Sequence, residues 1–242
     1  MTVTTKQTKS PPHGEQHAAL GTTGWLRPFV LGAEDGIVST AGLVIGVAAA
    51  GAGHATLLAA GGAGIAAGAL SMAAGEYVSV AAQRDVEHAD IARETWELEN
   101  LPEAELTELI SIYRSRGLAP ELANQVAVAL TAHDALTTHL RDELAIDLAI
   151  IARPWQAAWL SALSFFIGAA IPVATILLSP HRLRIAATML VTLVLLAGAG
   201  ALAGRLGRSS KLRGSLRVTA GGAAAMAVTW LIGNALGATG SV

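Results

Sequence analysis

The sequence predicts an all-α membrane protein, with five transmembrane helices and a helical lobe inserted between helices 2 and 3. Of the 242 residues, 52% are hydrophobic and only 14% are charged, a composition too apolar for a soluble domain. Five stretches are long and apolar enough to cross a hydrocarbon core about 30 Å thick. Of the 18 acidic residues, 14 lie between Asp85 and Asp147 and none follows Asp147, so one acidic segment interrupts the apolar ones.

The chain divides into four predicted segments. Residues 1–24 are polar and lack the apolar core of a signal peptide, so we expect a disordered tail. Residues 25–84 hold transmembrane helices 1 and 2, residues 85–153 form the acidic lobe, and residues 154–242 hold transmembrane helices 3 to 5. The predicted spans are residues 28–50, 55–80, 155–178, 185–204 and 218–239.

Basic residues predict the orientation of these helices, because cytoplasmic loops are enriched in Lys and Arg. The turn at residues 51–54 has neither, so we place both ends of the first helix pair inside. The N-terminus, the lobe and the loop 205–217 are then cytoplasmic, and the C-terminus is outside. Of the 16 Lys and Arg residues, only Arg182 and Arg184 fall outside. The loop 205–217 carries Arg205, Arg208, Lys211, Arg213 and Arg217.

The lobe sequence predicts three helices. The second span continues into the lobe without a helix breaker, which predicts one long helix that leaves the membrane. Asn100 is expected to cap a second helix, which ends at Gly117. A third helical region begins at Pro120 and extends toward Asp147, with a break near Asp134.

Within the lobe, metal-competent side chains recur at helical spacing. Three pairs share a helix face because their members are three or four residues apart: Glu94 with Glu97, Glu105 with Glu108, and His139 with Glu143. Carboxylate and imidazole groups suit Fe²⁺ and Mn²⁺, and helical proteins assemble such ligands from facing helices. A solvated acidic face explains the same spacing, so both interpretations stay open here. The chain has no cysteine, which excludes thiolate metal sites and disulfides.

Four residues of the first two spans are candidates for a transport path. Glu34 and Asp35 stand in an apolar run, where ionisable side chains usually face a polar interior and mark a path for ions. Adjacent helix positions point about 100° apart. Glu34 could therefore pair with a basic group or lie near lipid headgroups instead. Met72 and Glu76 share a face of the second span, although core packing would also explain Met72.

Three motifs resemble the vacuolar iron transporter family and its bacterial iron- and manganese-exporting relatives. They are EDGIVSTAGLVIGV at residues 34–47, GALSMAAGEYVSVAAQRDVEHAD at 68–90 and HDALTTHLRDELAI at 133–146. The resemblance covers about residues 25 to 240. It implies five membrane helices per subunit, a cytoplasmic metal-binding lobe, a homodimer, and exchange of divalent metal for protons without a prosthetic group.

The resemblance also implies roles for single residues. Asp35 and Met72 match positions that line the family's transport path. The family's lobe carboxylates match Glu94, Glu97, Glu105, Glu108 and Glu143. Near Glu143, plant members have two Met residues where this chain has His139 and Leu140. His139 either replaces a thioether ligand by an imidazole, which makes binding sensitive to pH near neutrality, or is a surface histidine.

The sequence therefore predicts a secondary transporter, not an enzyme, that exports Fe²⁺ or Mn²⁺ from the cytoplasm in exchange for protons. A phosphate-binding GxxxxGK[ST] loop is absent, so no use of ATP is expected. The expected partners are divalent metal ions, protons, the lipid bilayer and a second copy, but not nucleic acid, and the expected location is a bacterial plasma membrane. Two alternatives stay open. The first is a membrane-anchored carboxylate di-metal enzyme, although such sites favour Glu-x-x-His pairs and the acidic pairs here are Glu-x-x-Glu. The second is a metal buffer or sensor, which would leave the acidic residues of the membrane spans unexplained.

Overall fold

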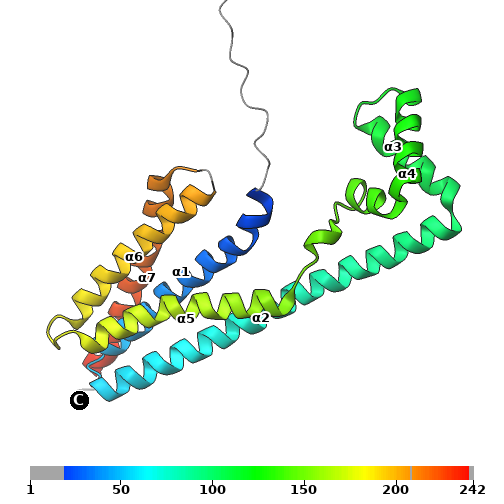
Figure 1. Cartoon of the computed structure of the whole chain (residues 1–242). Coiled ribbons are helices and arrows are strands. Elements are labelled where there is room, and N and C mark those ends of the chain that lie inside the picture. The colour runs from blue at the N-terminus through cyan, green and yellow to red at the C-terminus, as the bar shows by residue number, and fades with distance from the viewer. Residues whose placement is uncertain (1–18, 208, 240–242) are drawn as a thin grey trace, which may run out of the picture. The chain divides into compact units, whose positions relative to one another are not determined.

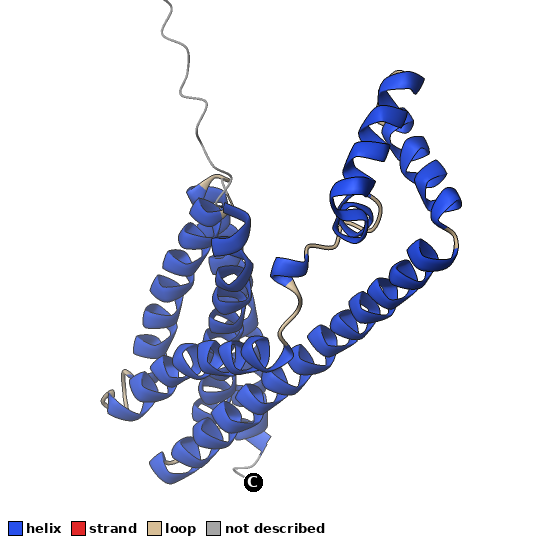
Figure 2. Ribbon diagram, turned by 45° about the vertical axis from the view of Figure 1, so that its right-hand side comes forward, coloured by secondary structure: helices blue, strands red, loops and turns tan. Residues whose placement is uncertain are grey.

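A computed structural model describes residues 19–207 and 209–239 (Figure 1). The described residues form seven α-helices and one short 3-10 helix, with no strand among them (Figure 2). This confirms the all-α class. In chain order the helices are α1 (Ala19–Ala49), α2 (His54–Asn100), α3 (Pro102–Ser115), α4 (Pro120–Asp142), η1 (Leu148–Ile150), α5 (Pro154–Leu178), α6 (Arg184–Leu206) and α7 (Lys211–Thr239).

Five of these helices are long and apolar enough to cross a membrane, in agreement with the five predicted spans: α1 from Phe29 onward, α2, α5, α6 and α7. Helix α2 has 47 residues, which at about 1.5 Å each gives roughly 70 Å. That is more than twice the thickness of a hydrocarbon core of about 30 Å. The polar second half of α2 therefore extends beyond the predicted span 55–80.

The chain forms two compact units, which we describe separately. The membrane unit comprises the described residues up to Met72 and from Leu160 onward, and the acidic unit comprises Ala73–Trp159. In the membrane unit, α1 packs against α6 and α7, which also pack against each other. Helix α6 buries every fourth residue, mostly a small or hydroxyl side chain, and such residues let helices approach closely. These residues are Arg184, Thr188, Thr192, Leu196, Gly200 and Gly204.

Arg184 is a buried cation at the start of α6. Its Nη2 donates a hydrogen bond of 2.9 Å to the carbonyl oxygen of Ala52 and lies 3.4 Å from that of Ala48. A positive group at a helix C-terminus donates hydrogen bonds to the free carbonyl oxygens there. It also interacts favourably with the partial negative charge at that end of the helix dipole. Arg184 therefore has a structural role at the end of α1.

In the acidic unit, α3 and α4 pack through an apolar cluster that includes Leu109 and Ala127. Gly117 ends α3 with φ of +97°, as the sequence predicts. The end of α4 is tied to α3 because Asp142 accepts hydrogen bonds from the Tyr113 hydroxyl at 2.7 Å and from Arg116 Nη1 at 2.9 Å. Burial alone would raise the pKa of Asp142, but these two donors outweigh it and hold the pKa below its ordinary value.

Two predictions about the lobe helices need correction. Asn100 does not cap α3, because its side-chain amide donates to the Trp96 carbonyl oxygen at 2.7 Å and so continues α2. Leu101 takes the capping position without a side-chain hydrogen bond. The predicted break at Asp134 is confirmed by its φ of −162° and ψ of 92°. Helix α4 ends at Asp142, short of the expected Asp147.

Two boundaries of the membrane helices also differ from prediction. Helix α7 begins at Lys211, so only a short part of the predicted loop 205–217 lies between α6 and α7. A side chain at Gly200 would lie 2.6 Å from the Gly214 carbonyl oxygen, so close backbone packing extends α7 into the predicted loop. Helix α1 begins at Ala19, inside the predicted tail. The rest of that tail, residues 1–18, lies outside the described residues.

Candidate metal centre

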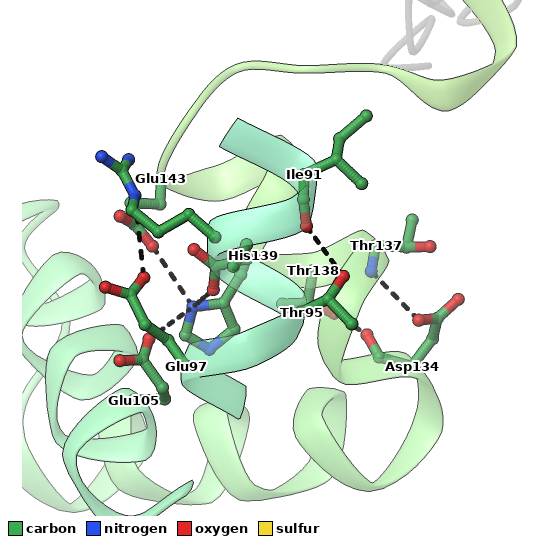
Figure 3. Close-up of polar contacts among 11 residues, drawn as sticks. Ile91, Thr95, Glu97, Glu105, Asp134, Thr137, Thr138, His139 and Glu143 are labelled. Carbon is green, nitrogen blue, oxygen red and sulfur yellow. Dashed lines mark hydrogen bonds and ion pairs between the residues drawn. The ribbon is translucent and has the colours of Figure 1, made fainter. Parts of the chain in front are cut away.

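The structure gathers three of the predicted lobe carboxylates around the imidazole of a fourth predicted residue, His139. His139 of α4 is fully buried, at 0% exposure, and therefore is not a surface histidine. Its Nδ1 lies 3.0 Å from Glu94 Oε1, 3.3 Å from Glu143 Oε2 and 3.6 Å from Glu105 Oε2. Figure 3 shows the Glu105 and Glu143 carboxylates on the side of the ring that carries Nδ1. Helices α2, α3 and α4 and the residue that caps α4 thus each bring a ligand-type side chain to one point.

The kink at Asp134 directs the second half of α4 toward this point. The Asp134 carboxylate accepts the Thr137 N–H at 3.0 Å, as an N-cap residue does, and its carbonyl oxygen accepts the Thr138 hydroxyl at 2.7 Å (Figure 3). The new helical segment then carries His139 and, four residues on, Glu143. One residue therefore both breaks α4 and restarts it.

Glu105 reaches the site through the sharp turn between α2 and α3. Its backbone N–H bonds to the Leu101 carbonyl oxygen at 3.1 Å, and Glu105 lies in the first turn of α3. A carboxylate is favoured there because the N-terminal end of a helix carries partial positive charge. Pro102 also suits this turn, since a proline at the start of a helix has no N–H to leave unsatisfied.

Burial and mutual repulsion perturb the carboxyl groups of the site. Burial, followed by the charge of Glu143, raises the pKa of Glu94 to about 7, although His139 opposes the shift. Burial and the charge of Glu108 raise the pKa of Glu105. Both carboxylate oxygens of Glu94 and Nε2 of His139 are buried without a hydrogen bond to any described residue. Such groups are costly to bury unless a proton or a cation neutralises the carboxylates.

The donor set fits a single divalent metal ion. The ligand atoms of Glu94, Glu105, His139 and Glu143 all lie within 4.8 Å of one another, and they are the one such group that the described residues form. A metal bound at about 2.1 Å holds neighbouring ligand atoms roughly 3.0 to 3.4 Å apart, close to the distances from Nδ1 given above. Three carboxylates and one imidazole suit Fe²⁺, Mn²⁺ or Zn²⁺.

Two predicted lobe residues lie outside this group. Glu97 Oε2 is 3.8 Å from Arg93 Nε, and the Glu108 side chain is exposed. Both carboxylates are still near enough for their charge to raise the pKa of Glu105. The six predicted residues therefore divide into two groups. We call the first the inner site: Glu94, Glu105 and His139, which are buried, and Glu143, which is partly exposed. We call Glu97 and Glu108 the outer pair.

In the membrane unit, Asp35 and Met72 line one cavity of about 250 Å³ between α1, α2 and α5. Ser39, Thr40 and Ser71 add hydroxyl groups to its wall. Sequence reasoning missed these hydroxyl residues, although Ser39 lies four residues after Asp35 and Ser71 lies beside Met72. The Ser39 hydroxyl donates to the Asp35 carbonyl oxygen at 2.6 Å.

Glu34 and Glu76 do not line this cavity. Glu34 is half-buried, and one of its carboxylate oxygens is buried without a hydrogen bond to a described residue. Its absence from the wall agrees with the expectation that neighbouring helix positions cannot both face one path. Glu76 is half-buried on α2, so the shared face predicted for Met72 and Glu76 does not bring both to the cavity.

Two glycines allow α1 and α5 to meet beside Asp35. A side chain at Gly36 would collide with the Phe165 carbonyl oxygen and lie 3.0 Å from the Ala169 nitrogen. A side chain at Gly168 would collide with the Ala33 carbonyl oxygen. The two backbones are therefore in direct contact, as small residues permit in membrane helices, and this contact fixes the position of Asp35.

Comparison with known proteins agrees with this combination of a membrane cavity and a helical acidic site. A model of the VIT family matches residues 26–234. The vacuolar iron transporter of Acanthamoeba castellanii is 47% identical over 222 residues, which cover 91% of this chain and 82% of that protein. Vacuolar iron transporter homolog 5 of Oryza sativa subsp. japonica is 37% identical over 207 residues, which cover 85% and 77%. The similarity extends over all five apolar helices and the acidic unit, and the chain belongs to the VIT family.

Proposed function

We propose that this protein transports Fe²⁺ or Mn²⁺ out of the cytoplasm in exchange for protons, without ATP. The observation that carries the proposal is the shared cavity of Asp35 and Met72 among apolar helices. An ionisable residue within a membrane span is costly and usually marks an ion path. The names of the relatives, which describe vacuolar iron transporters, agree with iron as the cargo.

The chemistry of the cavity suits exchange between a metal ion and a proton. The Asp35 carboxylate offers a hard ligand and the Met72 thioether a soft one, while nearby hydroxyls offer neutral oxygens. Borderline divalent ions such as Fe²⁺ accept both kinds of ligand. A carboxylate binds either a metal ion or a proton, so loading with one releases the other. Alternate loading of Asp35 from the two sides of the membrane gives exchange.

The acidic unit supplies the metal side of this exchange. Its excess of carboxylates attracts cations, and the inner site offers them four ligand groups, three of which are buried. The distribution of Lys and Arg favours a cytoplasmic position for this unit, which makes outward transport the productive direction. The same reaction would serve a plasma membrane, as the sequence predicts, or a vacuolar membrane, as the relatives' names indicate. We also propose a homodimer, on the family resemblance.

Transport by purified protein in sealed vesicles tests this proposal. We expect Asp35→Asn to lower Mn²⁺ and Fe²⁺ flux at least about tenfold, because the amide removes the charge that either cation needs. The matched control is Asp85→Asn, which makes the same change at an exposed residue of α2 outside the cavity. Metal binding by the inner site should persist in both variants. Wild-type flux in Asp35→Asn would refute the proposed path.

A further inference from the structure

A second cavity, within the acidic unit, has no role in the proposed transport. It has a volume of about 410 Å³ and is lined by Arg84 and His88 of α2 and by residues 151–156, which lead into the first turn of α5. Arg84 and His88 are four residues apart and so share a helix face. Arg153 adds a second guanidinium. The wall of the cavity is therefore basic.

Its arginines are free to bind an anion. The guanidinium groups of Arg84 and Arg153 form no ion pair or hydrogen bond with any described residue, whereas that of Arg116 is engaged by Asp142. The nearby carboxylate of Glu87 forms no ion pair with either arginine, and instead accepts the Gln83 side-chain amide at 2.8 Å and the Ala152 N–H at 3.3 Å. An unpaired arginine at a cavity wall is suited to bind a phosphate group through two parallel hydrogen bonds.

The start of α5 adds further donors to the same cavity. Pro154 is the first residue of this 25-residue helix, and Trp155 and Gln156 line the cavity. Their backbone N–H groups lie in the first turn, where a helix has no intrahelical acceptor for them. The partial positive charge of the helix end also favours an anion. Residues with guanidinium groups and residues with free backbone donors thus line one cavity.

The cavity lies at the end of a membrane span. Trp155 and Trp159 are 77% and 71% exposed, and the Trp155 ring packs 4.8 Å from the Tyr77 ring of α2. Aromatic side chains of this kind concentrate where lipid headgroups begin. The 25 residues of α5 measure roughly 37 Å at about 1.5 Å each, slightly more than a hydrocarbon core of about 30 Å. Its first turn therefore reaches the headgroup region.

We infer that this cavity binds the phosphate of an anionic phospholipid headgroup, held by Arg84 and Arg153. A lipid is favoured over a soluble phosphate because the exposed indole of Trp155 borders the basic wall and offers an apolar surface to the rest of the lipid. The bound headgroup would join α2 to the segment before α5. This inference needs membrane insertion of the chain but not metal transport, so binding is measured without flux.

Native mass spectrometry of the full chain in detergent tests the inference, with dioleoylphosphatidylglycerol as the probe and dioleoylphosphatidylcholine as the neutral comparison. We expect the double variant Arg84→Gln/Arg153→Gln to bind phosphatidylglycerol at least about tenfold more weakly than the wild type, because charge-assisted hydrogen bonds are lost. The control Arg205→Gln/Arg213→Gln removes two exposed charges elsewhere and should change binding by less than about twofold. Thermal unfolding in lipid-free detergent verifies that both variants are folded.

Three results would overturn the inference. Equal weakening in both double variants would show a general attraction to basic surfaces. Unchanged binding in Arg84→Gln/Arg153→Gln would remove the cavity from lipid binding. Displacement of the lipid by inorganic phosphate at equal concentration would identify a site for soluble anions.

Discussion

Glu94 is an acid that the fold buries beside two other acids. Its carboxylate is fully buried, and its oxygens find no hydrogen-bond donor of suitable geometry among the described residues. Burial of this carboxylate is therefore unfavourable, and binding of a proton or a divalent cation neutralises its charge. Residues held in this way commonly mark functional sites.

The raised pKa of Glu94 predicts how pH affects stability without metal. The Glu94 carboxyl group has an ordinary pKa of 4.5, which applies to the unfolded chain, and a pKa of about 7 in the folded protein. The unfolded state therefore loses its proton first as pH rises, and stability falls between these two values. We expect Glu94→Gln to be more stable than the wild type above about pH 8, by on the order of 2 kcal/mol, and to show less loss of stability with rising pH.

Thermal unfolding of the full chain in a chelator, between about pH 5 and pH 9, measures this difference across and beyond the range that the raised pKa defines. Glu99→Gln is the matched control, because Glu99 is an exposed acid of the same helix. A Glu94→Gln variant that follows the wild-type profile would contradict the buried, protonated state.

The inner site and the outer pair predict different effects on metal binding. Two matched double variants each remove two carboxylates, Glu94→Gln/Glu105→Gln from the inner site and Glu97→Gln/Glu108→Gln from the outer pair. We expect the first to weaken Mn²⁺ binding by about 100-fold, because it removes direct ligands, and the second by only about threefold, through lost electrostatic attraction.

Calorimetric titration of Mn²⁺ into the full chain compares the two variants at one pH. Transport at low metal concentration should slow in the first variant without ending, because Asp35 and Met72 are unchanged. Equal weakening in both variants would mean that the acidic residues act as a diffuse surface.

At the scale of the helices, the contact between α1 and α5 lies beside the cavity that Asp35 and Met72 line. Gly36 and Gly168 let the two backbones touch directly beside Asp35. Membrane helices have no strong hydrophobic force between them, so such close packing provides much of their association. The position of Asp35 therefore depends on Gly36 and Gly168, which do not line the cavity themselves.

Adding a single methyl group tests this contact. We expect Gly36→Ala to destabilise the membrane unit by about 1 to 3 kcal/mol, because the new atom meets backbone that cannot move aside. The matched control is Gly62→Ala on α2, where nothing lies within 4 Å of the added atom. There the change should be neutral or slightly stabilising. Thermal unfolding in detergent measures both, and equal stability of the two variants would contradict the packing.

The helices were more predictable than their junctions. Long apolar runs, Gly117 and Pro120 predict element boundaries because each depends on local chemistry. The start of α7 depends on the contact of Gly200 with Gly214, which spacing does not reveal. Spacing also shows which acids share a face, but not that the kink at Asp134 brings His139 to Glu94. Which predicted ligands belong to the inner site therefore emerges only from tertiary structure.

At the scale of the whole molecule, charge is segregated along the chain. The acidic residues concentrate between Asp85 and Asp147, and the segment after Asp147 has basic residues but no acid. An acidic unit is thus joined to apolar helices that contain few charges, among them Asp35. We propose that the two parts act in sequence, with the acidic unit raising the local metal concentration and the membrane unit carrying out the exchange.

Coupled flux in sealed vesicles measures this exchange most directly. Purified protein is reconstituted with a pH-sensitive dye inside, and Mn²⁺ or anaerobic Fe²⁺ is added outside. We predict metal uptake accompanied by a rise in internal pH, and faster uptake when the interior starts more acidic, because protons leave as metal enters. Uptake no greater than in protein-free vesicles, or uptake that leaves the internal pH unchanged, would contradict metal–proton exchange.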